Sequence, residues 1–144
     1  FDDFWRRTGE KRGGSVGIFT FATFLGRSGG EVLGLPGLMY TVGDAVWFED
    51  FERDNWLARL FGRRGQFQQT EVGFQKADVQ ATRLVSRGTA YRCVRGSMAS
   101  EQARPLSAFL RLFTTSVLQI SLSQGQSLYF EVMKMPEIRA FLGK

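Results

Sequence analysis

Hydrophobic and polar residues alternate along most of this chain, and a period of two is typical of β-strands. In the stretch 15–26, SVGIFTFATFLG, both alternating faces are apolar. That pattern predicts a strand buried on both sides, with a short helix as the alternative. In the stretch 37–52, GLMYTVGDAVWFEDFE, two alternating arms flank Gly43 and Asp44, which favour a tight turn. This stretch therefore predicts a β-hairpin.

The second arm of this hairpin carries aromatic and acidic residues on both of its faces. Trp47 and Glu49 belong to one face, whereas Phe48 and Asp50 belong to the other, because successive side chains of a strand point to opposite sides. One of the two rings is therefore expected to face away from the core. We expect that ring to be covered by the segment 55–61, NWLARLF, or by a partner.

Further strands follow the same alternation. The stretch 67–75 predicts one strand, and the stretch 77–96 predicts two strands with a turn at residues 86–88. Near the end of the chain, the stretches 115–123 and 127–133 predict a pair of strands. The inward positions of this pair are Leu118, Ile120, Leu122, Leu128, Phe130 and Val132.

Three stretches depart from the alternation and show helical spacing. Residues 54–62 predict a short helix with an apolar stripe. That stripe consists of Trp56, Leu57, Leu60 and Phe61. Residues 105–113, PLSAFLRLF, fit a helix with a proline at its first position, and a strand remains the alternative. Residues 135–144 predict a C-terminal helix, because Pro136 suits its first turn and the apolar residues that follow share one face.

The composition limits the chemistry that the chain can perform. The chain has 144 residues, a formal net charge of +5 and no histidine. Histidine is the commonest general acid–base group and the commonest metal ligand, and no catalytic motif is present, so we expect a protein that is not an enzyme. We also expect no cofactor and no metal site. The acids near the hairpin, Asp44, Glu49, Asp50 and Glu52, lack the spacing of a calcium-binding loop.

Cysteine and phenylalanine usage add two expectations. Cys93 is the only cysteine, so no disulfide can form within the chain, and we expect a reducing, cytoplasmic compartment. Its setting predicts a small core residue. The 14 phenylalanines are expected to fill the core, with a surface for a partner as the alternative for some of them. No stretch reaches the roughly 20 apolar residues that a membrane-spanning helix needs.

The order of these elements resembles the pleckstrin-homology (PH) superfold, in particular its GRAM-like and bacterial PH-like branches. Residues 30–52 resemble the family's acid-led opening strand and hairpin, and residues 67–84 resemble the strand step that follows. Residues 117–142 resemble the last strand pair and its helix, which opens with Pro-Glu. The resemblance implies a mainly β fold with α: a split barrel of about seven antiparallel strands closed by a C-terminal helix.

The same resemblance implies a single domain over residues 1–144. Residues 1–14 would form an N-terminal extension that docks on the body or on a partner, and residues 54–65 and 97–113 would be insertions. PH-like domains as a group are mostly non-catalytic docking modules. The basic motif that phosphoinositide-specific members carry between their first two strands is not matched here. The resemblance therefore implies docking rather than recognition of a particular lipid.

Two groups of arginines are the candidate binding residues. The first group flanks the predicted short helix and consists of Arg59, Arg63 and Arg64. Together with the apolar stripe it suits an anionic membrane surface, where rings enter the interface and guanidinium groups meet head groups. The alternative is that the stripe packs on the sheet. The second group consists of Arg83 and Arg87, with Arg92 and Arg95 nearby, and suits phosphate or carboxylate recognition. Its alternative is a solvated face.

These patterns predict an interaction module that docks its parent protein on a protein partner or on anionic lipid head groups. We expect a cytoplasmic location, with peripheral attachment to a membrane as an option. The alternative function is a carrier of a small hydrophobic ligand or lipid, with a phenylalanine-rich cavity. Nucleic acid is not an expected partner, because the arginines are dispersed and phenylalanine in alternating strands is typical of a core.

Overall fold

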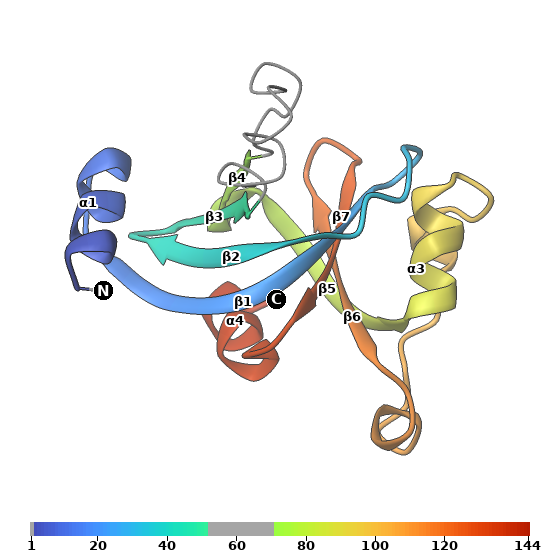
Figure 1. The fold of residues 1–144 in the computed structure, drawn as a ribbon. Coiled ribbons are helices and arrows are strands. Elements are labelled where there is room, and N and C mark those ends of the chain that lie inside the picture. The colour runs from blue at the N-terminus through green and yellow to red at the C-terminus, as the bar shows by residue number, and fades with distance from the viewer. Residues whose placement is uncertain (1, 52–70) are drawn as a thin grey trace, which may run out of the picture.

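The computed structural model describes residues 2–51 and 71–144, and every structural statement below refers to these residues. Seven strands in this part of the chain form one antiparallel sheet in the order β4-β3-β2-β1-β7-β6-β5 (Figure 1). They are β1 (Val16–Arg27), β2 (Leu35–Val42), β3 (Ala45–Asp50), β4 (Glu71–Gln75), β5 (Val79–Ser86), β6 (Ser116–Leu122) and β7 (Ser127–Val132). The sheet curls into a half-barrel, and a helix follows its last strand. The predicted mainly β fold with seven antiparallel strands and a C-terminal helix is confirmed.

The hairpin predicted from residues 37–52 is formed by β2 and β3. Val42 lies opposite Ala45 in the strand pairing, and Gly43 lies in the turn between them. Gly43 has a φ of 57°, a left-handed conformation that glycine adopts without steric cost. The stretch 15–26 lies in β1, so its strand prediction holds over the helical alternative.

Three α-helices lie in the described residues: α1 (Asp2–Arg12), α3 (Arg87–Val94) and α4 (Met135–Leu142). The C-terminal helix α4 was predicted from sequence, and its buried residues are Ile138 and Leu142. Pro136 lies in its first turn, and Gly143 ends it with a φ of 68°. Helix α1 forms from the predicted N-terminal extension and lies at the opposite end of the sheet from α3 (Figure 1).

The prediction of a strand after residues 86–88 is wrong, because this stretch forms α3. Ser86 does not start a hairpin turn but caps the helix, and its Oγ accepts a hydrogen bond from the Thr89 N–H at 3.1 Å. The buried residues of the helix are Ala90, Cys93 and Val94. Their spacing of three and four residues matches a helical face, which alternation around Tyr91 obscured. Cys93 is buried, as predicted, although in a helix.

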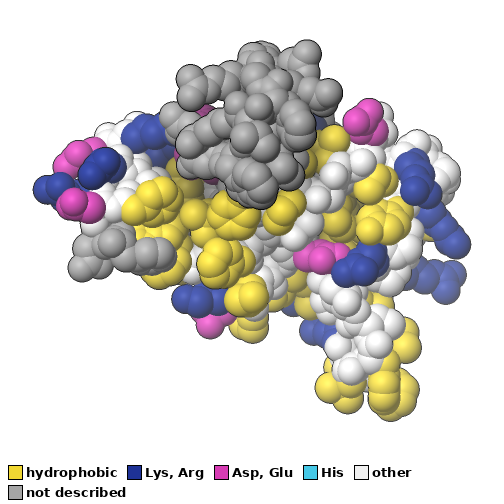
Figure 2. Space-filling model, viewed as in Figure 1, with side chains coloured by type: hydrophobic (Ala, Val, Ile, Leu, Met, Phe, Trp, Pro, Cys, Tyr) yellow, Lys and Arg dark blue, Asp and Glu magenta, His cyan; other side chains and the backbone are white. Residues whose placement is uncertain are grey.

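The stretch 105–113 forms neither the continuous helix nor the strand considered from sequence. Leu106 is buried, and its N–H binds the Leu84 carbonyl of β5 at 2.7 Å, which uses the backbone at the start of the stretch. Only a short 3₁₀ turn, η4 (Leu110–Leu112), follows. Residues 107–113 leave the body as a projecting loop, seen at the lower right of Figure 1 and as the apolar tip in Figure 2.

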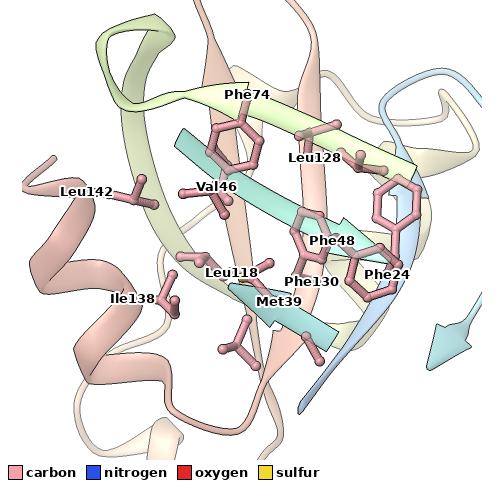
Figure 3. Packing of buried hydrophobic residues seen from close by; sticks show 14 of the residues in the cluster. Phe24, Met39, Val46, Phe48, Phe74, Leu118, Leu128, Phe130, Ile138 and Leu142 are labelled. Atoms are coloured by element: carbon pink, nitrogen blue, oxygen red, sulfur yellow. The ribbon is translucent and has the colours of Figure 1, made fainter. Parts of the chain in front are cut away.

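The main core lies on the inner face of the curled sheet, the face that packs against α4. Its centre is formed by the rings of Phe24, Phe48 and Phe130, with centroids 4.9–5.8 Å apart (Figure 3). The predicted inward positions of β6 and β7 all belong to this core. Ring pairs at these distances add stability beyond the area they bury. Phe24, Phe48 and Phe130 therefore fill the core, as predicted. The prediction is wrong for six other phenylalanines, which are exposed: Phe4, Phe19, Phe21, Phe51, Phe109 and Phe113.

A second core lies on the outer face of the sheet, beneath α3. Its members are Leu25, Val85, Ala90, Cys93, Val94, Ala103, Val117 and Tyr129. Strands β1, β5, β6 and β7 are therefore buried on both faces where α3 covers them. Within the stretch 15–26 this second core includes Leu25, whereas Phe19 and Phe21 on the same face are exposed. The predicted burial on both sides therefore holds only at the α3 end of β1.

Candidate functional site

The projecting loop of residues 107–113, SAFLRLF, is called the apolar loop below. Four of its side chains are exposed: Phe109 (68%), Leu110 (47%), Leu112 (77%) and Phe113 (71%). The rings of Phe109 and Phe113 contact each other, with centroids 5.2 Å apart. Single exposed apolar residues are common, but a contiguous group of large ones marks an interaction surface.

Local hydrogen bonds give the apolar loop a defined shape. The Ser107 Oγ accepts a hydrogen bond from the Leu110 N–H at 3.2 Å, and the Ser107 carbonyl accepts one from the Arg111 N–H at 3.1 Å. On the far side, the Leu110 carbonyl accepts hydrogen bonds from the hydroxyl and the N–H of Thr114. The exposed rings are therefore presented by a closed turn rather than by an open chain.

The chain that leads to the apolar loop is fixed to the sheet by Arg83 of β5. Its Nη1 donates hydrogen bonds to the carbonyl oxygens of Glu101 at 3.2 Å and Ala103 at 2.9 Å. Gln119 of β6 donates to the Ser100 carbonyl in the same segment at 3.3 Å. Arg83 was predicted as an anion-binding residue, and the structure places its guanidinium on backbone carbonyls. Here it positions the segment that carries the loop.

A buried tyrosine supports the same segment from the sheet. The Tyr129 hydroxyl donates to the Gln119 Oε1 at 3.0 Å and lies 2.8 Å from the Ser100 hydroxyl. Burial raises the pKa of Tyr129 well above its ordinary value, so the phenol remains a neutral donor. Because each polar group has a partner, the base of the loop is held without a buried unpaired charge.

The same end of the molecule carries an excess of positive charge. Between residues 83 and 111 the chain has six arginines and one acid, Glu101. Arg87 of α3 binds Glu131 of β7, with Nε and Oε1 2.6 Å apart. The remaining arginines, outside the Arg83 clasp and this pair, are Arg92, Arg95, Arg104 and Arg111. All four are exposed, and no carboxylate among residues 2–51 and 71–144 forms an ion pair with them.

Helix α3 and the apolar loop both lie at the end of the molecule away from α1 (Figure 1). Arg111 is part of the loop itself, between Leu110 and Leu112. Arginine side chains and apolar residues are therefore both exposed at this end (Figure 2). We call Arg92, Arg95, Arg104, Arg111 and the apolar loop together the arginine–apolar surface.

A second feature lies at the other end, where α1 rests on the outer face of the sheet. The ring of Trp5 packs on Phe19 of β1 with centroids 4.4 Å apart, and on Tyr40 of β2 at 5.9 Å. About two turns further along the helix, the Arg12 guanidinium lies over the Trp47 ring of β3. The surface under α1, called the cradle below, consists of Phe19, Tyr40, Trp47, Glu49 and Glu71.

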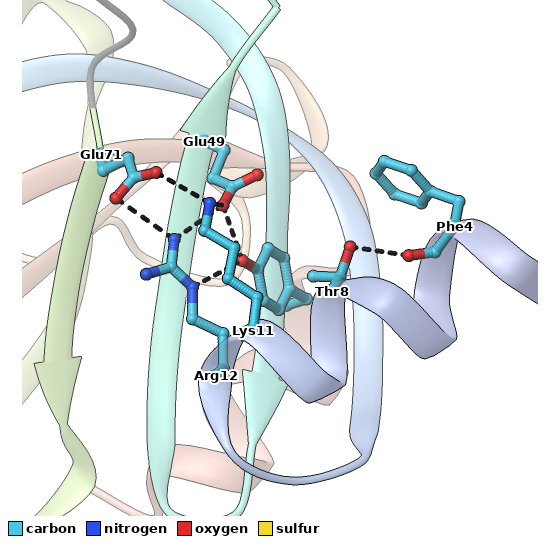
Figure 4. A network of polar contacts seen from close by, with 7 residues as sticks. Phe4, Thr8, Lys11, Arg12, Glu49 and Glu71 are labelled. Carbon is cyan, nitrogen blue, oxygen red and sulfur yellow. Dashed lines mark hydrogen bonds and ion pairs between the residues drawn. The ribbon is translucent and has the colours of Figure 1, made fainter.

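Ion pairs fix the end of α1 in the cradle (Figure 4). Arg12 lies 2.6 Å from the Glu49 Oε1 and 3.3 Å from the Glu71 Oε2, and it donates to the Tyr40 hydroxyl at 3.1 Å. Lys11 lies 3.1 Å from both carboxylates. Only 9% of the Arg12 side chain and 14% of the Glu49 side chain are exposed, so the ion pair between these two is poorly screened by solvent.

The pKa values in the cradle follow from burial and from these hydrogen bonds. Burial opposes the charged form of Arg12, but hydrogen bonds to Tyr40 and Glu49 outweigh it and raise the pKa of Arg12. Burial also raises the pKa of Tyr40 to about 12. For Glu49, burial acts to raise the pKa, but donors from Lys11 and Arg12 lower it below its ordinary value. The Glu49 carboxylate of the cradle and the Arg12 guanidinium of α1 are thus both charged over the physiological pH range.

The structure shows which of the two aromatic rings of β3 faces the core. Phe48 lies in the main core, and Trp47 faces outward. The cover that the structure shows for Trp47 comes from Arg12 of α1. The predicted alternative, the segment 55–61, lies outside the described residues. The contacts of Arg12 were not predicted from sequence, because its partners are far away along the chain. The basic pair Lys11-Arg12 and the acids of β3 were the only local signals of these contacts.

Several predicted site residues lie outside the described part of the chain. They are Trp56, Leu57, Arg59, Leu60, Phe61, Arg63 and Arg64. The two that the structure does place, Arg83 and Arg87, lie near the junction of β5 and α3, and each already has a protein partner. The exposed residues of the apolar loop were missed, because the sequence pattern fits a buried helical face equally well.

Among residues 2–51 and 71–144, no group of three or more histidine, cysteine or acidic side chains is placed to hold a metal ion. No helix in the same residues is long and apolar enough to cross a membrane. In comparisons with known proteins, no family model and no curated protein matches the chain.

Proposed function

We propose that this chain is a non-catalytic interaction module that docks on an anionic membrane surface. In this proposal the apolar loop enters the interfacial region of the lipid, and the surrounding arginines contact head groups. The observation that carries the proposal is the exposure of Phe109, Leu112 and Phe113 on a closed turn that also contains Arg111. Apolar side chains beside basic ones are the combination by which peripheral proteins bind anionic lipid.

The expected strength of this contact is modest. Each arginine near an anionic surface contributes about 1 kcal/mol. A large apolar side chain contributes about 1 kcal/mol if half of it is buried, since full burial is worth roughly 1.5–3 kcal/mol. Four arginines and four apolar side chains then give at most about 8 kcal/mol, which corresponds to micromolar binding. Binding of this kind is reversible, as a docking module requires.

The fold supports the same class of protein. Seven antiparallel strands followed by a C-terminal helix agree with the PH-like or GRAM-like assignment, which we retain as part of the proposal. The contacting rings of Phe24, Phe48 and Phe130 favour a docking module over the carrier alternative, because a carrier needs an open interior. The lipid-facing surface of the proposal is at the opposite end from α1.

Vesicle sedimentation tests the proposal on the full chain. We expect binding to phosphatidylcholine vesicles that contain phosphatidylserine, weak binding to phosphatidylcholine alone, and loss of binding at high salt. The double variant Phe109→Ser, Phe113→Ser should reduce binding at least tenfold. Phe21→Ser is the matched control, since Phe21 is an exposed phenylalanine of β1 outside this surface, and it should bind as the wild type does.

Two kinds of result would overturn the proposal. The first is the lack of any preference for anionic vesicles, whether the chain binds both vesicle types equally or binds neither. The other is unchanged vesicle binding by the double variant together with its failure to capture a protein that the wild-type chain captures, which would assign the apolar loop to a protein partner. Native mass spectrometry with a lipid co-purified in the interior would favour the carrier instead.

A further inference from the structure

Helix α1 is seated on the sheet by a narrow stripe. Trp5 and Arg12 make the contacts described above, and Thr8 and Gly9 between them are buried. Open crevices run along both sides of this stripe. One has a volume of about 310 Å³ and is lined in part by Phe4 and Lys11, and the other has a volume of about 410 Å³. The helix therefore sits on the cradle as a separable body rather than as a part of the core.

The cradle is complementary to a basic helix with an aromatic residue. A single oxygen, the Glu49 Oε1, accepts from Lys11, Arg12 and the Tyr40 hydroxyl, at 3.1, 2.6 and 2.9 Å. Among the described residues, α1 provides ring and charge partners for this surface: Trp5 for Phe19 and Tyr40, and Arg12 for Trp47 and both carboxylates. The surface therefore has the charge and shape of a binding site whose occupant is known.

The connection between α1 and β1 is short and consists mainly of glycine. Gly13 has a φ of 83°, and its N–H binds the Glu10 carbonyl at 3.2 Å, while the Gly14 N–H binds the Gly9 carbonyl at 2.9 Å. This pair of bonds is the Schellman ending of a helix, which stops α1 and reverses the chain. Glycine can also adopt an extended conformation at little cost, so the turn at Gly13 and Gly14 can open without strain.

We propose that the cradle is a binding site for a basic helix, and that α1 of a second copy of this chain occupies it when the Gly13–Gly14 turn opens. Every contact of α1 is the same whether the helix comes from its own chain or from the other. The equilibrium is therefore set by the glycine turn and by concentration, since a short tether gives an effective concentration in the millimolar range. Exchange of an identical element is a low-cost route to a symmetric dimer.

The proposal is independent of membrane docking, because the cradle and the arginine–apolar surface lie at opposite ends of the molecule. A charge swap tests it on full-length chains. The first chain carries Lys11→Glu and Arg12→Glu, so its helix and its cradle are both acidic. The second chain carries Glu49→Lys and Glu71→Lys, so its helix and its cradle are both basic. In each chain alone, α1 is repelled from its own cradle, whereas in a mixture each helix matches the cradle of the other chain.

Light scattering gives the decisive result. We expect the equimolar mixture to show twice the mass of the single chain, which is 16.3 kDa. A single chain with all four substitutions is the matched control, because its helix and cradle match in one chain, and it should remain monomeric. Circular dichroism of each chain confirms that it is folded. A mixture of folded chains that stays monomeric would overturn the proposal, and so would a control that dimerises equally.

Milder variants keep the test open if a charge-reversed chain does not fold. One chain carries Lys11→Gln and Arg12→Gln, so its acidic cradle has no basic helix within the same chain. The other chain carries Glu49→Gln and Glu71→Gln, so its basic helix has no acidic cradle within the same chain. Exchange predicts a dimer in their mixture and less of it in either chain alone. Equal monomer content in all three samples contradicts exchange between copies.

Discussion

The guanidinium carbon of Arg12 lies 3.8 Å from the centre of the Trp47 ring, although the two residues are 35 positions apart in the chain. Trp47 belongs to the hairpin whose alternation left one ring without cover, and Arg12 ends a helix at the N-terminus. The same guanidinium also bonds to Glu49 and Tyr40. A side chain with a cation–π contact and ion pairs in one place is expected to determine whether α1 stays on the sheet.

Replacement of Arg12 by alanine is expected to destabilise the protein. Because the side chain is largely buried and its hydrogen bonds involve charged partners, we expect a loss of about 2 kcal/mol in the free energy of unfolding. Urea unfolding at neutral pH measures it. Arg7→Ala is the matched control, since Arg7 belongs to the same helix but its pair with Asp3 is exposed, and a loss below about 0.5 kcal/mol is expected there. Equal losses in the two variants would show that the contacts of Arg12 stabilise the protein no more than the exposed pair of Arg7 does.

The parts of the fold that could be predicted from sequence are those set by local pattern. The turn at Gly43 and the C-terminal helix each depend on a few neighbouring residues with strong preferences, and both were predicted correctly. Helix α3 was missed because its eight residues contain only two turns, and Tyr91 and Cys93 alternate as they would in a strand. The capping residue Ser86 was the local signal that distinguishes a helix from a strand in this stretch.

The candidate sites depend on relations that no local pattern contains. The cradle joins Arg12 to acids of β3 and β4, and the sheet order that brings those strands beside each other is a tertiary property. The apolar loop has the composition of a buried helix, and only the absence of an opposing surface in the described structure makes it exposed. Sequence alone therefore identified the kinds of residue but not which of them meet and which face solvent.

Acid is expected to weaken the attachment of α1. The pKa of Glu49 is lowered in the folded protein, so its contribution to stability is complete above the ordinary value of 4.5 and is lost as the pH falls through the lower folded value. Wild type should therefore lose more unfolding free energy between pH 6 and about pH 3 than Glu49→Gln does. Urea unfolding of both proteins across this range measures the difference, and parallel pH curves would contradict the assignment.

The phenylalanines of the apolar loop and of the core should behave in opposite ways. Phe113→Ser is expected to change the unfolding free energy by less than about 0.5 kcal/mol, because the ring is exposed. Phe130→Ala should cost about 3–5 kcal/mol, because its ring is buried against Phe24 and Phe48. Thermal and urea unfolding of both variants and the wild type measure these changes in unfolding free energy. A large loss for Phe113→Ser would mean that the loop stabilises the fold, and the docking proposal would lose its main support.

Removal of the cap on α3 is expected to loosen the arginine–apolar surface. Ser86→Ala removes the acceptor for the Thr89 N–H and should cost about 1 kcal/mol. Ser123→Ala serves as control, because Ser123 is an exposed serine in the turn after β6. Hydrogen exchange of α3 amides should accelerate in the first variant and not in the second. Unchanged exchange in Ser86→Ala would show that tertiary packing alone holds the start of the helix.

Gly73 of β4 gives the most specific test of the contact between Arg12 and Trp47. It lies directly opposite Trp47 in the strand pairing, and a Cβ at residue 73 would overlap the Trp47 ring, with Cη2 at 2.9 Å. Gly73→Ala must therefore displace the ring and disturb the Arg12 contact, at a cost of about 1–3 kcal/mol. Gly88→Ala is the control, because nothing lies within 4 Å of a Cβ there, and alanine in α3 should be neutral or stabilising.

A double-mutant cycle separates displacement of the ring from general overpacking. If Gly73→Ala acts through the Arg12 contact, its cost should be clearly smaller in the Arg12→Ala background than in the wild type, because the contact is already lost there. Urea unfolding of the four proteins gives the coupling free energy, expected to be at least about 0.5 kcal/mol. Strict additivity would mean that the Trp47 ring and α1 are stabilised independently, and that the glycine is required only for strand packing.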